Sequence, residues 1–343
     1  MNTQSARQKQ GKDNPKFDKQ KEHSMITTID RKRIYIFVAI AYGISIALAV
    51  VVFLNGGIYI SYPLVMRPLA YLLMSVFMFA PAVAHIATRL ITREGWSLTL
   101  LRPNFRRGWP FYLAAWFLPA LATIVGATIY YLLLPSRFDA SMAFAREAGL
   151  VPAAGFTDPW TFLITQTPLT LLLTIPTIPL MLGEEFGWRA YLLPKLMPLG
   201  ARKAVLLIGV IHGAWHWPFF LMGYNYGFGY WGAPVVGALL YLVFVCFLST
   251  FLAWVTLRSG SFWPAALAHG VINNSVNWTL LYSRGAVDPL LGPQPMGIIA
   301  MLGYAVLALL LFFSRSALTG PAPAPVDKAL SGKPGAVEQA AHA

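Results

Sequence analysis

The chain has 343 residues, of which 57% are hydrophobic and only 11% are charged, and its mean hydropathy is positive. In soluble domains about a quarter of all residues are charged, so this composition excludes an ordinary soluble globular protein. It predicts an integral, multi-pass membrane protein.

The first 33 residues are basic and contain almost no large apolar side chains. Such a segment cannot bury enough apolar surface to form a core, so we expect a disordered cytoplasmic tail over residues 1–33. Residues 314–343 are rich in proline and alanine, which predicts a second disordered cytoplasmic tail. Between the tails, residues 34–313 form the predicted membrane domain.

Uncharged apolar runs long enough to cross about 30 Å of hydrocarbon occur about eight times along the chain. They are Ile34 to Leu54, Leu69 to Thr88, Pro110 to Leu134, Trp160 to Gly183, Ala204 to Met222, Ala233 to Leu257, Phe262 to Leu281 and Gly297 to Phe313. The first run follows a long polar tail without a cleavage signature, so we expect a retained span rather than a signal peptide. We therefore predict an all-α membrane protein, a bundle of about eight transmembrane helices.

The formal net charge of +13 could indicate a nucleic-acid partner, but the positions of the 26 Lys and Arg residues give another explanation. With eight spans and the first tail inside, 22 of them fall in cytoplasmic segments and 4 fall outside: Arg67, Arg137, Arg146 and Arg284. The positive-inside rule then places both termini in the cytoplasm. We expect membrane lipid as a partner and no nucleic acid.

Few side chains in the apolar region can carry chemistry. Between residues 159 and 287 the acidic residues and histidines are Glu184, Glu185, His212, His216 and His269. An ionisable group at membrane depth costs at least about 2.5 kcal/mol on insertion scales, so their joint presence indicates a functional site. His85, alone in the second run, is typical of a hydrogen bond between helices. The lone cysteine, Cys246, excludes a disulfide framework within the chain.

Spacing groups these residues on helix faces, because residues four apart lie on the same side of a helix. Glu185 with Arg189, His212 with His216, and His269 with Asn273 are such pairs. The adjacent Glu184 and Glu185 are turned by about 100° from one another, which predicts separate roles. We expect Glu185 to pair with Arg189, and Glu184 to face the interior of the bundle.

A buried Glu and His, supported by a second His and an Asn, suit general-base activation of water and stabilisation of an oxyanion. The corresponding reaction is hydrolysis. Glu and His are also ligands of zinc, which would activate the water directly. The residues alone leave both mechanisms open.

The pattern resembles the CPBP intramembrane proteases, named for CAAX-prenyl proteases and bacteriocin-processing proteins and also called the Abi family. The family motif Glu-Glu-x-x-x-Arg corresponds to Glu184, Glu185 and Arg189 in "GEEFGWRAYLLP". An aromatic residue followed four positions later by His corresponds to "HGAWHWP", which ends the motif at His216 and has His212 at the aromatic position. The third motif, His-x-x-x-Asn, corresponds to His269 and Asn273.

The resemblance implies a CPBP-like core of four catalytic helices over about residues 93–283 and an endopeptidase that cleaves near the cytoplasmic leaflet. Its implied catalytic residues are Glu184, His216, His269 and Asn273, and its supporting residues are Glu185, Arg189 and His212. If a metal is present, the implied ligands are Glu184, His216 and His269, with zinc as the candidate ion.

The implied substrate is a peptide or protein, with a prenylated one among the options, and the expected location is the plasma membrane of a prokaryote. Two other functions stay open at this stage. One is a family member without catalytic activity that acts as a membrane scaffold or immunity factor. The other is a small transporter whose buried Glu and His residues relay protons.

Overall fold

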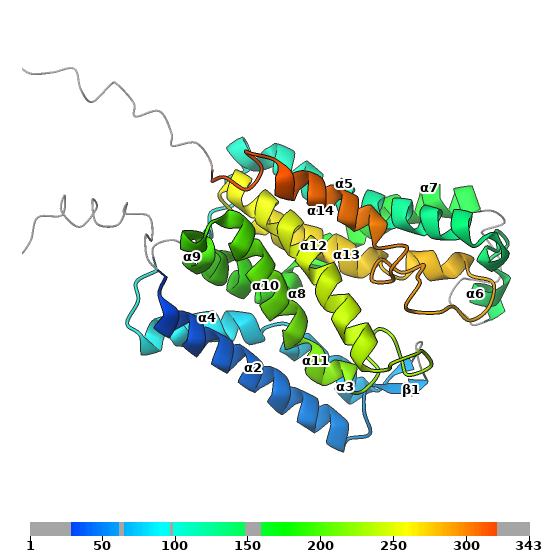
Figure 1. Cartoon of the computed structure of the whole chain (residues 1–343), viewed down its shortest axis with the longest axis horizontal. Helices are drawn as coiled ribbons and strands as arrows, with labels where there is room; N and C mark the ends of the chain where they lie inside the picture. Colours follow the sequence, from blue (N-terminus) through cyan, green and yellow to red (C-terminus); the bar gives the residue numbers. More distant parts are fainter. Residues whose placement is uncertain (1–28, 62–64, 97–98, 148–158, 321–343) are drawn as a thin grey trace, which may run out of the picture.

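The protein is described by a computed structural model that covers residues 29–61, 65–96, 99–147 and 159–320 (Figure 1). Most of both predicted tails lies outside these residues. The described chain is mainly helical, which confirms the predicted all-α class. A two-stranded antiparallel hairpin of β1 (Tyr59–Ser61) and β2 (Val65–Met66) is a small addition that the apolar pattern did not predict.

Among the described residues, five helical stretches are long and apolar enough to cross a membrane. They are Arg31–Leu54, Pro68–Ile91, Phe105–Leu133, Ile164–Leu199 and Val235–Ser259. Each overlaps one of the eight predicted runs, which confirms a multi-pass membrane protein. The other three predicted runs contain shorter helices, so the count of eight spans stays a prediction.

The N-terminal part of the fold consists of α2 (Arg31–Leu54), α3 (Pro68–Phe77) and α4 (Ala80–Ile91). It is followed by α5 (Phe105–Leu133), η1 (Pro135–Arg137) and the short α6 (Ala143–Glu147). Asp30 begins α2 as its N-cap, where its carboxylate accepts a hydrogen bond of 3.2 Å from the Arg33 backbone N–H.

The central part is a nearly continuous helical path with several changes of register. It comprises α7 (Pro159–Leu173), η2 (Ile175–Thr177), α8 (Ile178–Gly187), the π-helical η3 (Trp188–Leu192), α9 (Leu193–Leu196) and η4 (Met197–Leu199). We call residues 178–196 the motif helix, because the predicted Glu-Glu-x-x-x-Arg motif lies within it.

The C-terminal part completes the bundle. It contains α10 (Ala201–Trp215), α11 (Trp217–Phe220), α12 (Val235–Ser259), α13 (Trp263–Ser275), η5 (Trp278–Tyr282) and α14 (Leu302–Phe313). The last two predicted spans therefore correspond to α13 and α14, which are shorter than a full crossing of the hydrocarbon.

Two apolar cores flank the motif helix. One joins α2, α3 and α4 to η3 and α10, and the other joins α5, α12, α13 and α14. In Figure 1, α2 and α4 lie along one side of the bundle, α5, α7 and α14 along the other, and α8 between them. Because α8 packs against both α4 and α13, its side chains can meet residues from distant parts of the sequence.

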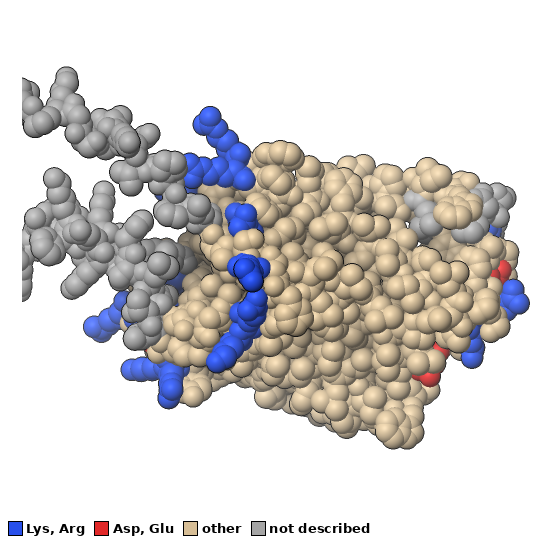
Figure 2. Space-filling model, turned by 45° about the horizontal axis from the view of Figure 1, so that its top comes forward, with Lys and Arg blue, Asp and Glu red and all other residues tan. Residues whose placement is uncertain are grey.

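Lys and Arg residues gather at one end of the molecule, where the described residues next to both tails also lie (Figures 1 and 2). A long surface almost free of charge separates this end from the other, where a few charges of both signs appear. An uncharged band between charged ends is the surface expected of a protein that spans a bilayer.

Candidate active site

Close backbone packing places α8 against the junction of α3 and α4. A Cβ on Gly183 would lie 2.5 Å from the Met78 carbonyl oxygen, and a Cβ on Gly187 would overlap Pro81. Only glycine allows an approach this close, and the two glycines are four residues apart on one helix face. They flank Glu184 and Glu185 and so fix the position of both carboxylates relative to α4.

Glu184 is buried in the interior of the bundle, on the side of the α10 histidines. Its carboxylate accepts a hydrogen bond of 2.8 Å from His212 Nε2, and both side chains are buried. His216 lies at the C-cap of α10, and its Nδ1 donates to the His212 carbonyl oxygen at 3.1 Å. In a neutral His216 this bond leaves the lone pair on Nε2.

Glu185 has a separate set of partners, which agrees with the separate role predicted for it. Arg189 Nη1 donates to Glu185 Oε1 at 3.1 Å, and Arg189 Nε lies 3.1 Å from Oε2. His269 Nδ1, on α13, donates to the same Oε1 at 2.9 Å. Glu185 and Arg189 are completely buried, so this ion pair joins α8, η3 and α13 without contact with solvent.

The structure brings together a metal-ligand set that differs from the predicted one. One nitrogen or oxygen atom from each of Glu184, His212 and His216 lies within 4.8 Å of the other two. His269 is adjacent, with its ring centroid 6.3 Å from that of His212, but it is bound to Glu185 instead. The group that could hold a metal thus includes His212, and the set of Glu184, His216 and His269 stays a prediction.

This set fits zinc in its chemistry. Two histidines and one glutamate are a donor set found in catalytic zinc sites. A metal-bound histidine usually donates its second N–H to an acceptor, and His216 does so through the His212 carbonyl. The second nitrogen of His212, Nδ1, is buried without a hydrogen-bond partner among the described residues.

Asn273 lies one turn after His269 on α13, as predicted, but the structure does not show it within the cluster. Its amide donates to the sulfur of Met181 on α8 at 3.4 Å, and its side chain is exposed. The neighbouring Asn274 bonds to the hydroxyls of Thr174 and Thr177. A role for Asn273 toward an oxyanion stays a prediction.

Aromatic rings pack against the histidines of the site. The sequence motifs did not predict these aromatic residues. The Trp188 ring stacks on His212 with centroids 5.1 Å apart, and Trp215 packs edge-on against His216 at 4.8 Å. Tyr241 contacts the His216 ring at 5.2 Å. Their positions next to the motifs could have indicated the first two, since Trp188 is four residues after Glu184 and Trp215 directly precedes His216.

Comparison with known proteins identifies the segment that carries this geometry. Residues 164–275 match the family model for the type II CAAX prenyl endopeptidases, described as Rce1-like. This confirms the predicted resemblance to the CPBP family for that part of the chain. No curated protein matches the sequence.

The segment matched to the Rce1-like family contains all three predicted motifs and lies within the predicted core of residues 93–283. It covers the motif helix, α10, α12 and α13, which are the helices that surround the cluster. The match supports an intramembrane protease as the kind of protein.

Proposed function

We propose that the protein is an intramembrane endopeptidase that hydrolyses a peptide bond with a water activated by Glu184 and His216. The observation that carries the proposal is the convergence of Glu184 and two histidines from α10, at depth in an apolar bundle. His212 holds one oxygen of the carboxylate and leaves the other able to accept a proton from water. His216 Nε2 can orient or protonate the reacting groups.

His269 is the residue proposed to face the reacting carbonyl from α13. Its Nδ1–H is held by Glu185, which is itself held by Arg189, so the imidazole ring is oriented by a buried carboxylate. When Nε2 also carries a proton, a histidine oriented in this way donates Nε2–H to the carbonyl oxygen and stabilises the charge that develops there. Asn273 is proposed to assist it from the next turn of α13.

A zinc ion would be held by Glu184, His212 and His216, and would supply a polarised water for the attack. Without it, the same Glu184 acts as general base. The role of His269 is common to both mechanisms, because its orientation depends on its bond to Glu185. His216 Nε2 would bind the ion in the zinc mechanism and would act on the reacting groups only in the metal-free one.

The depth of the cluster supports cleavage near the cytoplasmic leaflet. We propose that the end rich in Lys and Arg faces the cytoplasm, with both termini there. His269 follows the start of α13 by about 9 Å along the helix axis, and His212 follows the start of α10 by about 16 Å. Both helices begin at the basic end, so the site lies in the half of a ~30 Å hydrocarbon layer on that side or close to its middle.

An apolar cavity supports a substrate with an apolar chain. A space of about 660 Å³ lies between α2, α11 and α12, and Ala214 and Trp217 on its wall flank His216 in the sequence. We propose that the hydrophobic part of a membrane-bound peptide, such as a prenyl group, occupies it during cleavage. If so, a prenylated peptide should be cleaved with a higher kcat/KM than an unmodified peptide of the same sequence.

The test is cleavage of a fluorogenic CAAX-type peptide, prenylated or not, by the purified protein in liposomes. Glu184→Gln should lower kcat/KM by about 10²–10⁴-fold, since the amide cannot accept the proton. Glu147→Gln is the matched control, because Glu147 is an exposed carboxylate on α6. Unchanged turnover by Glu184→Gln would reject the catalytic proposal in favour of a protein that binds peptides without cleaving them.

Metal analysis of the same samples separates the two mechanisms. A zinc mechanism predicts about one zinc per chain, lost with His216→Ala, and loss of activity with a chelator. Full activity of metal-free protein would assign the base role to Glu184 alone.

A further inference from the structure

His85 forms a polar bridge between α4 and the motif helix, away from the proposed reacting groups. Its ring is completely buried. Arg89 Nε donates to His85 Nε2 at 2.6 Å, so the ring proton lies on Nδ1, and Nδ1 donates to the Phe186 carbonyl oxygen at 2.9 Å. This confirms the interpretation of His85 as a hydrogen-bonder between helices. It also places a fixed donor one residue after Glu185.

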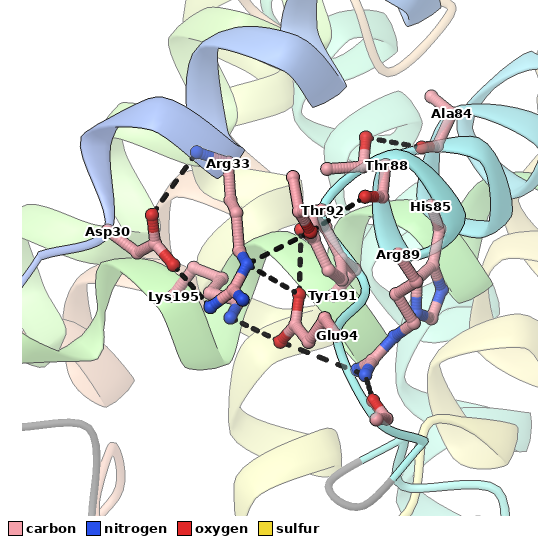
Figure 3. A network of polar contacts seen from close by, with 11 residues as sticks. Asp30, Arg33, Ala84, His85, Thr88, Arg89, Thr92, Glu94, Tyr191 and Lys195 are labelled. Carbon is pink, nitrogen blue, oxygen red and sulfur yellow. Dashed lines mark hydrogen bonds and ion pairs between the residues drawn. The ribbon is translucent and has the colours of Figure 1, made fainter.

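Arg89 is itself held by several groups at the basic end (Figure 3). Its guanidinium donates to the Gly95 carbonyl, lies 3.7 Å from Glu94 Oε1, and stacks over the Tyr191 ring at 5.4 Å. Glu94 also binds Lys195 and accepts a hydrogen bond of 3.2 Å from the Tyr191 hydroxyl. The chain of contacts from Glu94 to the Phe186 carbonyl therefore begins in a cluster of several polar contacts.

The Phe186 carbonyl lies where the motif helix changes register. Leu193 N–H bonds to the Trp188 carbonyl five residues back, whereas Trp188 N–H bonds to the Glu184 carbonyl four residues back. A single residue of slippage between α- and π-type register would turn the side chains by about 100°. The Phe186 carbonyl lies between the α-type and the π-type bonds. The hydrogen bond from His85 to this carbonyl therefore fixes where the register changes.

We propose that His85 and Arg89 are positioning residues that hold the start of the π-helical segment and thereby aim Glu184 and Glu185. This inference deepens the proposed function and rests on it for its kinetic consequence. Arg89 fixes the tautomer of His85, and His85 fixes the Phe186 carbonyl. Neither residue contacts the substrate.

Four variants test the proposal. His85→Leu removes the donor to Phe186, whereas His85→Asn places an amide N–H where Nδ1–H stood. Arg89→Met removes the group that sets the tautomer. Thr88→Val is the matched control on α4, since the buried Thr88 hydroxyl donates within its own helix, to the Ala84 carbonyl at 2.6 Å.

The kinetic readout is the separation of kcat from KM for the reporter peptide. His85→Leu should lower kcat by roughly 10- to 100-fold with KM unchanged, because the carboxylate is misplaced rather than the substrate. His85→Asn should restore kcat to within about threefold of the starting protein. Arg89→Met should lower kcat in the original background but not further in the His85→Asn background, because an amide always presents its donor.

Hydrogen exchange supplies a readout that does not depend on catalysis. Backbone amides of residues 184–193 should exchange faster in His85→Leu, return toward the original rate in His85→Asn, and stay unchanged in Thr88→Val. If His85→Leu alters neither this exchange nor kcat, or if His85→Asn rescues neither, the inference is wrong. A protein that cleaves no peptide but shows the exchange pattern would overturn the proposed function and retain the positioning role.

Discussion

Two clusters of ionisable side chains meet the motif helix, and they balance their charges in opposite ways. At the basic end, Glu94 is surrounded by three cations: Arg33 Nε at 3.4 Å, Arg89 Nη1 at 3.7 Å, and the ammonium group of Lys195. Asp30 binds the same Arg33 at 2.6 Å. Every carboxylate in this cluster therefore has a permanent cation beside it.

In the candidate site the two carboxylates share a single permanent cation. Arg189 binds Glu185, while Glu184 has His212 as its hydrogen-bond donor. A histidine is a cation only when it is protonated, so the hydrogen-bond partner of Glu184 is not a permanent cation. A buried carboxylate in such surroundings suits the role of a general base or a metal ligand.

The comparison separates structure from chemistry on one helix. The cluster at Glu94 joins α2, α4 and α9. A reaction of its carboxylates would break an ion pair. At Glu184 the hydrogen-bond partner is a histidine rather than a permanent cation, and aromatic rings pack against the histidines. The same residue types thus stabilise the packing of helices around Glu94 and form a candidate reactive group around Glu184.

The largest expected effect on stability comes from removal of the cation in the candidate site. Arg189→Met would leave Glu185 buried beside only His269, and we expect a loss of about 3–5 kcal/mol in the free energy of unfolding. Denaturant unfolding in mixed micelles, followed by tryptophan fluorescence, measures it.

The double variant Glu185→Gln with Arg189→Met controls for packing. It should recover part of the loss, because no unpaired charge stays buried. Equal stability of the single and double variants would show that Arg189 acts through its volume, and the contrast between the two clusters would then lose its electrostatic basis.

A smaller effect is expected from the close approach that positions the candidate site. Gly187→Ala would force the Cβ against the Pro81 backbone, at a cost of about 1–3 kcal/mol. Gly43→Ala on α2 is the matched control, since a Cβ there meets nothing within 4 Å and alanine favours the helix. Thermal unfolding of both variants, together with reporter cleavage, tests whether the carboxylates depend on this contact. Equal melting temperatures for the two variants would contradict it.

The sequence predicted the helical class and the pairing of Glu185 with Arg189, because apolar run length and four-residue spacing are local properties. Glu185 with Arg189 and the inward direction of Glu184 followed from the ~100° turn per residue. The family match covers residues 164–275, the part of the chain in which all three motifs lie.

What the sequence could not predict depends on contacts between distant helices. His212 hydrogen-bonds to Glu184 and His269 to Glu185, and these partners depend on how α10 and α13 pack against α8. The register change at Trp188 was equally hidden, since an apolar pattern over so few residues is compatible with both α- and π-type bonding. The use of Glu94 as a common partner required three helices to meet at one point.

The smallest effect is expected at the edge of the cluster around Glu94. The pair of Asp30 and Arg33 is about 30% exposed on each side, and exposed pairs contribute about 0–1 kcal/mol. Asp30→Asn keeps the N-cap of α2, because asparagine accepts the same backbone hydrogen bond, and it removes only the charge. We expect a change in stability below about 1 kcal/mol that disappears at high salt. A larger, salt-independent loss would mean that Asp30 is an essential part of the cluster around Glu94. Arg33 would then depend on its contact with Asp30 to stay beside Glu94.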